Sequence, residues 1–318
     1  MLDQPITFPG ITSQSIPRVT FQTSQELGIH LAAARTPFIA VGLLDSWKAL
    51  REWTPSYFAH RYTDLEVAAS LDLPSTGSPY ARRPGDHVRK MKLGEFIEFM
   101  GNASKACYIH QMSFTKLPEL ISDTEFEVIL PPGTENGMFY LWLGSGGTRS
   151  GLHFDRFDNI NAQIFGKKSV FLVSPDQSSK LYPFKDNVEK SQLDPDAPQF
   201  EQFPRFRFVK AHTGIIEPGE VLFIPKLWWH HIRSLEPAIN VNCWYGEHIP
   251  LTALLGVVNA GGLACWSQVM KDFVLYGLLG RKARTRLFSD TATGEFLYSI
   301  MVAAIKKRSP SLTRRSRE

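Results

Sequence analysis

The stretch GLHFDRFDNINAQIFGKK, residues 151–168, decides the fold. It places His153 and Asp155 one residue apart and continues with polar side chains spaced among apolar ones. Because alternate residues of a β-strand face the same side, these two side chains are expected to point together. Alone, such a pair is typical of ordinary hydrogen-bonded or surface residues, so its interpretation depends on the rest of the chain.

A second stretch, LFIPKLWWHHIRSL at residues 222–235, adds the adjacent His230 and His231. Two neighbouring residues cannot both face the interior from a regular strand. Either histidine, with His153 and Asp155, would give two imidazoles and one carboxylate, the ligand set that binds non-haem Fe(II) and leaves positions open. Open positions distinguish such a site from a closed structural zinc site. This pattern leaves the choice between the two histidines open.

Polar residues also recur at every second position, the spacing at which side chains share one face of a β-strand. Counting by twos from His153 reaches Phe157, Asn159, Asn161 and Gln163, a polar face that is costly inside a protein unless its groups are paired or bind something. Asp158 falls on the other face and is expected to be solvated.

Three further sites extend the pattern. Asn242 and Trp244 share a face in INVNCWYGE, as do Tyr108 and His110 in CYIHQ. Lys168 begins the next strand; by itself it suggests an exposed lysine at a turn, whereas a buried ammonium would need an anion.

Composition indicates a globular, strand-rich protein. The chain has 318 residues, of which 43% are hydrophobic and 12% aromatic, with 21 prolines and a net charge of +4. Three scattered cysteines predict buried thiols in a reducing compartment. With neither a signal-peptide pattern nor an apolar run long enough for a membrane, the sequence predicts a cytoplasmic protein.

The fold class expected is mainly β, with an antiparallel β-barrel or jelly-roll core and flanking helices. Short strand-like segments with turn signals recur without long helices between them. We expect an N-terminal α/β lead-in at 1–104, the catalytic core at 105–250 and apolar helices at 251–305. A basic, disordered tail is expected at 306–318, and the loop at 74–86 is a candidate mobile lid.

From about residue 37 to 245, the sequence resembles the JmjC or cupin-type oxygenases that depend on Fe(II) and 2-oxoglutarate. The phrases HFDRFDNINAQIFGKKSVFLVSPDQSSKLYP and PGEVLFIPKLWWHHIRSL are similar to the branch of the asparaginyl hydroxylase that inhibits hypoxia-inducible factor. The resemblance implies that the core is a cupin-like double-stranded β-helix, the jelly-roll form of the two options above. It also implies a hydroxylase that converts 2-oxoglutarate to succinate, with ascorbate as an assisting reductant.

The resemblance assigns roles to individual residues. His153, Asp155 and His230 would be the iron ligands, and His231 would point outward. Lys168 would pair with the distal carboxylate of 2-oxoglutarate, beside the hydroxyl groups of Tyr108 and of Ser150, where the relative has threonine. The other cosubstrate residues implied are Asn159, Asn242 and Trp244.

Substrate contacts are implied less directly. Gln163 occupies a polar position near the pocket, and His110 stands where the asparaginyl hydroxylase has a glutamine that contacts its peptide. This difference weakens the case for the same substrate. In that branch the C-terminal helices form a homodimer, which we therefore expect here.

Alternatives remain within and outside this class. A JmjC-type demethylase, or a hydroxylase of a small molecule or RNA, would use the same pocket. A cupin that binds metal without oxidising anything is a further alternative. Lys168, Tyr108 and Ser150 argue against it, because such a protein does not need residues that bind a dicarboxylic acid. The basic tail makes nucleic-acid binding a minor alternative, and a protein or peptide is the expected substrate.

Overall fold

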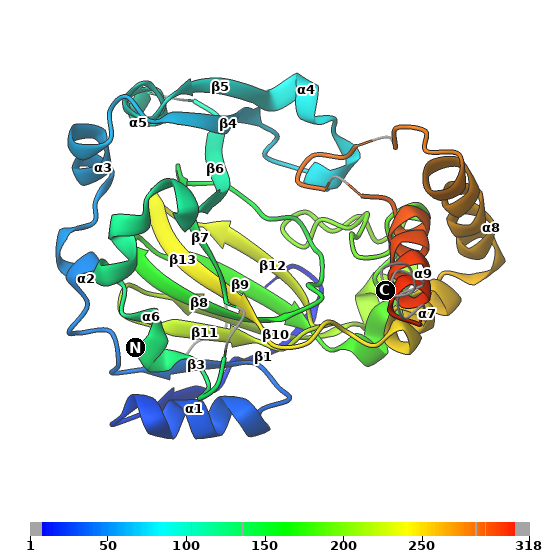
Figure 1. Cartoon of the computed structure of the whole chain (residues 1–318), viewed down its shortest axis with the longest axis horizontal. Coiled ribbons are helices and arrows are strands. Elements are labelled where there is room, and N and C mark those ends of the chain that lie inside the picture. The colour runs from blue at the N-terminus through cyan, green and yellow to red at the C-terminus, as the bar shows by residue number, and fades with distance from the viewer. Residues whose placement is uncertain (1–7, 103, 135–136, 284, 290, 309–318) are drawn as a thin grey trace, which may run out of the picture.

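The computed structural model describes residues 8–308, except residues 103, 135–136, 284 and 290. In this part of the chain the strands form two sheets, which enclose the interior of a jelly roll (Figure 1). The predicted fold class, mainly β with flanking helices, is confirmed.

The smaller sheet has the strand order β1, β10, β9, β12. Its β1 pairs with β10 in parallel, and the other pairs are antiparallel. The strands are β1 (Thr12–Ser15), β10 (Lys210–Ile216), β9 (Lys168–Val173) and β12 (Trp229–Ser234).

The larger sheet has nine strands in the part of the chain that is described. In spatial order they are β2 (Arg18–Thr20), β3 (Phe38–Val41), β11 (Val221–Ile224), β8 (Asp158–Phe165), β13 (Ala238–Tyr245), β7 (Met138–Gly144), β6 (Ala106–Ser113), β4 (Glu66–Leu73) and β5 (Val88–Lys92).

Strand β9 shows why these sequences form sheets that are covered on both sides. All six of its residues are buried, and its β-branched and aromatic side chains alternate between two clusters. Phe171 and Val173 pack in a cluster with Trp229, whereas Val170 and Leu172 pack in another. Burying each of these large apolar side chains contributes about 1.5–3 kcal/mol.

Residues 151–168 do not form one regular strand, although counting by twos along this stretch assumed one. His153 lies in no named strand and forms two isolated bridges, one with Lys190 and one with His230 of the smaller sheet, with which it exchanges backbone hydrogen bonds; β8 begins at Asp158 in the larger sheet. The chain therefore passes from one sheet to the other between these points. This corner brings the two predicted ligands of the stretch against β12.

The N-terminal lead-in is part of the barrel walls, because it supplies β1 to the smaller sheet and β2 to β5 to the larger one. Its helix α1 (Ser24–Ala33) is capped at the N-terminus, where the Thr23 side chain accepts from the Glu26 amide and the Glu26 side chain accepts from the Gln22 amide. Its other helices are α2 (Lys48–Glu52), α3 (Pro55–Arg61), α4 (Pro84–His87) and α5 (Leu93–Asn102).

Single-turn elements follow, connecting the strands. They are α6 (Phe126–Ile129) and the 3₁₀ turns η1 (Pro79–Ala81), η2 (Phe114–Lys116), η3 (Pro118–Asp123), η4 (Pro175–Lys180) and η5 (Pro204–Phe208).

The loop predicted as a mobile lid, residues 74–86, is held against the barrel. Tyr80 is 1% exposed, and its hydroxyl donates to the Ser150 carbonyl at 2.5 Å. Ser78 donates to the Ser191 carbonyl at 2.7 Å. These bonds join the loop to the segment that leads into His153.

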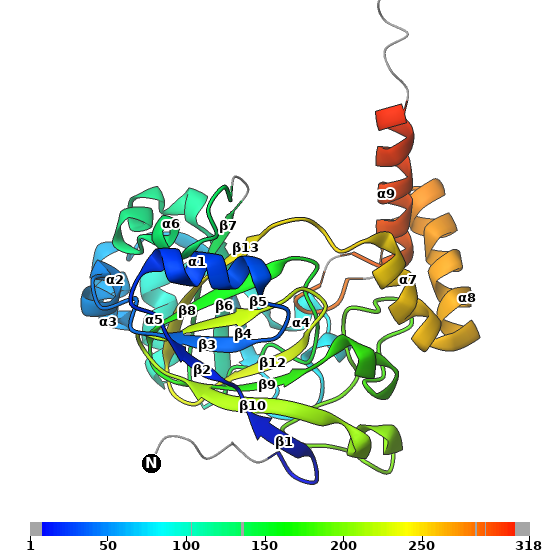
Figure 2. The ribbon, with the colours of Figure 1, turned by 90° about the horizontal axis from the view of Figure 1, so that it is seen from below.

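The C-terminal helices confirm the predicted helical appendage. They are α7 (Leu251–Ala260), α8 (Gly262–Asp272), the π-helical turn η6 (Phe273–Leu278) and α9 (Thr293–Arg308). Figure 2 shows α8 and α9 side by side and projecting from the barrel. Helix α9 continues into the predicted tail, of which residues 309–318 lie outside the described residues.

Two smaller predictions can be compared with the structure. Cys107, Cys243 and Cys265 are buried free thiols, as expected. Within the described residues, none of the helices has the length and apolar character that crossing a bilayer requires.

Candidate metal centre

Three ligand-type side chains meet at the corner between the sheets. One ligand atom each from His153, Asp155 and His230 lies within 4.8 Å of the others. Asp155 Oδ1 is 3.7 Å from His153 Nε2, and Asp155 Oδ2 is 3.5 Å from His230 Nε2. Two imidazole nitrogens and a carboxylate at these separations fit a divalent transition metal with open positions.

Backbone pairing fixes both imidazoles. The His153 amide donates to the His230 carbonyl at 3.0 Å, and the His230 amide donates back at 2.6 Å. Each Nδ1 lies 3.0 Å from a carbonyl oxygen, that of Gly151 or Trp228, so each Nδ1 carries the proton and each Nε2 keeps its lone pair for a metal. Burial lowers the pKa of both imidazoles, which also favours this neutral form.

The carboxylate of Asp155 is also oriented by neighbours. Its Oδ2 accepts hydrogen bonds from Trp244 Nε1 at 2.8 Å and from Asn159 Nδ2 at 3.2 Å. Asn159 Oδ1 in turn accepts from Asn242 Nδ2 at 3.0 Å, and Asn242 Oδ1 accepts from Trp142 Nε1 at 2.6 Å. The structure thus brings Asn159, Asn242 and Trp244 together around the ligand, on β8 and β13.

Lys168 lies in the same pocket and is 4% exposed. Its Nζ contacts Asn240 Oδ1 and lies 5.9 Å from the centre of the Tyr108 ring. Among the described residues no carboxylate lies within 4 Å of this ammonium, and burial lowers its pKa to about 7. A buried cation without a counter-ion is costly, so this end of the pocket fits a bound anion.

The hydroxyl residues predicted beside Lys168 also line this pocket. Ser150 Oγ accepts from the Ile232 amide and donates to the Gly151 carbonyl, each at 3.0 Å. Tyr108 faces the pocket from β6, and burial raises the pKa of its phenol.

Sequence reasoning missed part of the lining. Asn240, Trp142, Thr148 and Ser234 also line the pocket. Asn240 could have been found, because Asn240, Asn242 and Trp244 follow one another at every second position of β13 and so share one face. Trp142 and Thr148 could not have been found in this way, because no sequence pattern links their segments to the stretches that contain the metal ligands.

The two predicted substrate residues lie outside this lining. Gln163 Nε2 donates to the carbonyls of Phe165 and Gly166 at 2.8 and 2.7 Å, so it supports the turn between β8 and β9. His110 packs beside Trp142 at 6.2 Å between ring centres, and burial together with the charge of Lys190 lowers its pKa to about 4.

His231 points away from the metal ligands, as predicted, and it is buried there. It is 1% exposed, and its Nε2 lies 2.9 Å from Asp196 Oδ2. Asp194 lies in the same cluster, where Arg149 pairs with it at 2.7 Å and Arg233 lies 3.7 Å from Asp196. Because arginines already balance these acids, we interpret the cluster as structural.

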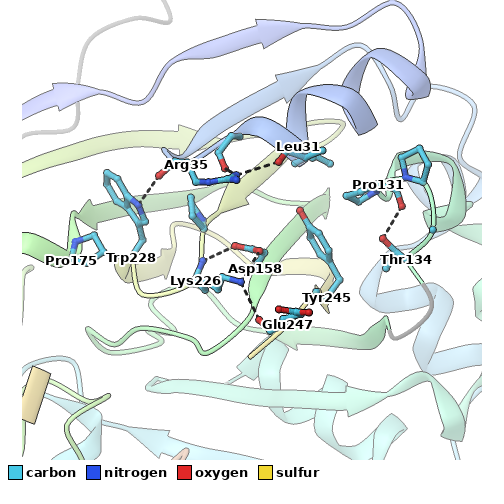
Figure 3. A pocket seen from close by; sticks show the side chains of 16 residues that line it. Leu31, Arg35, Pro131, Thr134, Asp158, Pro175, Lys226, Trp228, Tyr245 and Glu247 are labelled. Atoms are coloured by element: carbon cyan, nitrogen blue, oxygen red, sulfur yellow. Dashed lines mark hydrogen bonds and ion pairs between the residues drawn. The ribbon is translucent and has the colours of Figure 1, made fainter. Parts of the chain in front are cut away.

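A larger cleft of about 790 Å³ lies outside the barrel, between α1 and the end of β13 (Figure 3). Asp158 lines it, accepting from the Lys226 amide at 2.9 Å and lying 3.8 Å from Lys226 Nζ, so it is paired and not merely solvated as predicted. Trp228 Nε1 also donates to the Arg35 carbonyl there, at 3.1 Å. The cleft contains no histidine or cysteine among its described lining residues and offers no set of metal ligands.

Comparison with known proteins shows what the chain resembles. Residues 24–250 match the family described as Cupin-like domain. The chain is 30% identical over 240 residues to "Lysine-specific demethylase 8" of Xenopus tropicalis, covering 73% of this chain and 53% of that protein.

Two further relatives have different names. "Jumonji C domain-containing protein 5" of Drosophila melanogaster is 28% identical over 249 residues, which cover 72% of this chain and 59% of that protein. The "tRNA wybutosine-synthesizing protein 5" of Danio rerio is 28% identical over 218 residues, covering 63% of this chain and 66% of that protein. The chain thus spans 53–66% of the length of these relatives.

Proposed function

The chain belongs to the Cupin-like domain family, and from this membership we propose that it is an Fe(II)- and 2-oxoglutarate-dependent oxygenase that hydroxylates a C–H bond of a protein or peptide side chain. One observation carries the proposal: a set of two histidines and one aspartate shares its pocket with a buried lysine that lacks a counter-ion among the described residues. A cupin that only binds metal has no need of such a lysine. The non-oxidising alternative therefore explains less of the pocket.

The residues divide the work between metal and cosubstrate. His153, Asp155 and His230 would hold Fe(II), with Trp244 and Asn159 fixing the carboxylate. Lys168 would neutralise the distal carboxylate of 2-oxoglutarate, beside Tyr108 and Ser150. When bound, iron and cosubstrate would supply the oxidising chemistry, in which dioxygen is the oxidant: one of its oxygen atoms enters succinate as 2-oxoglutarate loses carbon dioxide, and the other enters the C–H bond.

Electrostatics favour hydroxylation of an uncharged group over demethylation of methyl-lysine. Lys190 forms an isolated β-bridge with His153, and its ammonium lies 5.1 Å from the centre of the Tyr80 ring, which is itself 5.9 Å from that of His153. The nearby acid Glu189 pairs with Arg156. A methylated ammonium would therefore meet a positive charge close to the metal ligands. Demethylation remains the alternative that the name of one relative suggests.

The remaining alternatives differ in substrate. A relative named for tRNA wybutosine synthesis makes an RNA substrate a second candidate, and a small molecule would use the same metal centre. The names of the relatives support the family and leave the asparaginyl hydroxylase branch, the homodimer and the cytoplasmic location as sequence predictions.

The test begins with the purified full chain, Fe(II), ascorbate and 2-oxoglutarate. We expect one bound iron, cosubstrate binding and a weak metal-to-ligand absorption band without oxygen. His153→Ala or Asp155→Ala should abolish the band and all succinate formation, whereas His231→Asn, on the opposite face of β12, should retain iron. A protein that binds neither iron nor 2-oxoglutarate would reject the proposal.

Product analysis separates the substrate alternatives. The enzyme is incubated with cell extract or candidate peptides, and products that depend on 2-oxoglutarate are identified by mass spectrometry. Hydroxylation adds one oxygen atom to a peptide. Loss of a methyl group with release of formaldehyde would instead establish a demethylase, and modification confined to RNA would establish the second candidate.

A further inference from the structure

Four buried asparagines of β8 and β13 line the pocket that contains the predicted metal ligands, and hydrogen bonds join them in two pairs. In the first pair, Asn242 Nδ2 donates to Asn159 Oδ1, and Asn159 Nδ2 donates to Asp155 Oδ2. In the second pair, Asn240 Nδ2 donates to Asn161 Oδ1 at 3.1 Å. The first pair thus supports a metal ligand, whereas the second lies at the other end of the pocket, where Asn240 contacts the lysine predicted to bind the cosubstrate.

The chemistry of Lys168 determines which way the second pair of amides points. An ammonium group donates hydrogen bonds and cannot accept them, so Asn240 must turn its Oδ1 toward Lys168 Nζ. Asn240 Nδ2 then faces Asn161, which accepts with its Oδ1. The orientation of both amides in this Lys168–Asn240–Asn161 network therefore follows from the charge of the lysine.

The network ends in an amide donor that lies in the pocket. Asn161 is 8% exposed and lines the pocket together with Lys168. Within the part of the chain that the structure describes, Asn161 Nδ2 has no hydrogen-bond partner. A buried amide group without a partner is costly, so this position fits a ligand that accepts a hydrogen bond.

The donors and acceptors of the network show which kind of ligand group fits. Asn240 Oδ1 and Asn161 Oδ1 each accept a hydrogen bond inside the network. Lys168 uses one of its N–H groups for Asn240 and has others left, and Asn161 Nδ2 uses none. An ionised carboxylate accepts without donating, so it matches both donors and also supplies the counter-charge that the ammonium lacks.

We propose that Asn161 is a further cosubstrate-binding residue, whose amide donates beside Lys168 to the distal carboxylate of 2-oxoglutarate, and that Asn240 is the positioning residue that orients this amide. The inference rests on the proposed function, because 2-oxoglutarate is the ligand that would bring the carboxylate. The family resemblance assigns no role to either asparagine.

The first test compares the wild type with Asn161→Leu, which keeps the approximate size of the side chain and removes the amide. Calorimetric titration of the full chain with Fe(II), without oxygen, measures the affinity for 2-oxoglutarate. We expect Asn161→Leu to bind it about 10- to 100-fold more weakly, as for the loss of a hydrogen bond to a charged group. Its affinity for Fe(II) should equal that of the wild type.

Two controls separate this role from a general loss of structure. The ligand control is 2-oxopentanoate, which has a methyl group in place of the distal carboxylate and should bind Asn161→Leu no more weakly than the wild type. The protein control is Asn187→Leu, because Asn187 is 5% exposed and its amide donates to Ser289 and Thr291, outside the pocket. It should bind 2-oxoglutarate like the wild type. Melting temperatures show whether each variant is folded.

The second test uses Asn240→Asp, which changes the charge and hardly changes the shape. The new carboxylate would pair with Lys168 and, because it only accepts, would draw the Asn161 amide donor toward itself. We expect 2-oxoglutarate to bind at least about tenfold more weakly. Without cosubstrate the variant should melt no lower than the wild type, because the buried ammonium gains a counter-ion. Loss of a purely structural amide would lower the melting temperature instead.

The outcomes distinguish the inference from the function on which it rests. Wild-type affinity for 2-oxoglutarate in folded Asn161→Leu would overturn the role of Asn161, as would an equal loss of affinity for 2-oxopentanoate. Wild-type affinity in Asn240→Asp would overturn the role of Asn240. In each of these cases the proposed function stands. A wild type that binds no 2-oxoglutarate in the presence of Fe(II) would reject the function and the inference together.

Discussion

At the scale of single residues, Lys168 is the group whose charge depends most on what occupies the pocket. Burial lowers its pKa to about 7, below the ordinary value of 10.5. A bound dicarboxylate favours the ammonium and raises this pKa. We therefore predict that 2-oxoglutarate affinity falls as the pH rises above about 7, by up to about tenfold per pH unit.

Calorimetric titrations between about pH 6 and pH 9 measure this dependence, and the cosubstrate should take up protons as it binds. Lys168→Arg is the control, because its guanidinium stays charged throughout the range and its affinity should not follow this slope. A wild-type affinity that is constant over the whole range would contradict the role of Lys168 as the anchor.

Trp244 is the residue that most directly orients a metal ligand. Its Nε1 donates to Asp155 Oδ2 at 2.8 Å. Trp244→Phe removes this donor and keeps most of the aromatic wall, so metal affinity should fall about 10–100-fold, as for other partners of metal ligands. Iron or manganese titration measures the change. Trp266→Phe is the matched control, because that indole donates only to Asn259 on the C-terminal helices; an equal loss there would contradict the prediction.

Among the secondary-structure elements, the sequence predicted which residues line the pocket better than it predicted the strands and sheets to which those residues belong. Parity along β13 correctly grouped Asn242 with Trp244, because the pairing of β13 with β8 keeps one register from Asn240 to Tyr245. Parity also grouped Asn159 and Asn161 correctly with Asp155, but it did not predict that the chain leaves one sheet for the other before Asp158. A change of sheet depends on pairing with His230, more than 70 residues away in sequence, which local periodicity does not report.

The turn between β8 and β9 determines where Lys168 lies. Gly166 has a φ of +70°, and a Cβ there would clash with the Pro237 carbonyl oxygen. Gly166→Ala should therefore lower the free energy of unfolding by at least about 2 kcal/mol, through backbone strain and overpacking together. It should also weaken 2-oxoglutarate binding, because the turn immediately precedes Lys168.

Chemical denaturation measures the first effect. Gly77→Ala separates strain from the clash, because Gly77 has a φ of +78° but an added Cβ there would have no described atom within 4 Å. It should cost only about 1 kcal/mol. Equal losses in the two variants would show that backbone conformation alone determines the stability of the turn.

For the whole molecule, the features that the sequence did not predict are those that depend on contacts between segments distant in sequence. The strands β4 and β5 and the N-terminal β1 were not predicted. Strand β1 pairs with β10 and β4 with β6, partners that lie farther along the sequence, and β5 joins the sheet only through β4. One hydrophobic cluster joins Trp47 and Phe96 of the lead-in to Ile160 and Val241 of the barrel. The predicted division at residue 104 therefore crosses a continuous core.

The C-terminal helices leave an apolar face that the described part of the chain does not cover. Leu263 is 89% exposed, and Met270, Val274 and Leu278 are 50%, 42% and 56% exposed. Their spacing of seven, four and four residues places them along one side of α8 and η6. A second copy of the chain would bury this face, in line with the homodimer that the sequence resemblance implies.

We predict that the chain sediments and scatters light at micromolar concentration with twice the monomer mass of 35.9 kDa. Leu263→Glu with Met270→Glu should place charges on the face and yield the monomer, because a buried unpaired charge at an interface costs several kcal/mol. Ile29→Glu on α1 is the matched control, since Ile29 is 64% exposed on a helix at the opposite end of the barrel from α8 (Figure 1). A monomeric wild type, or dissociation by the control variant alone, would reject an interface on α8.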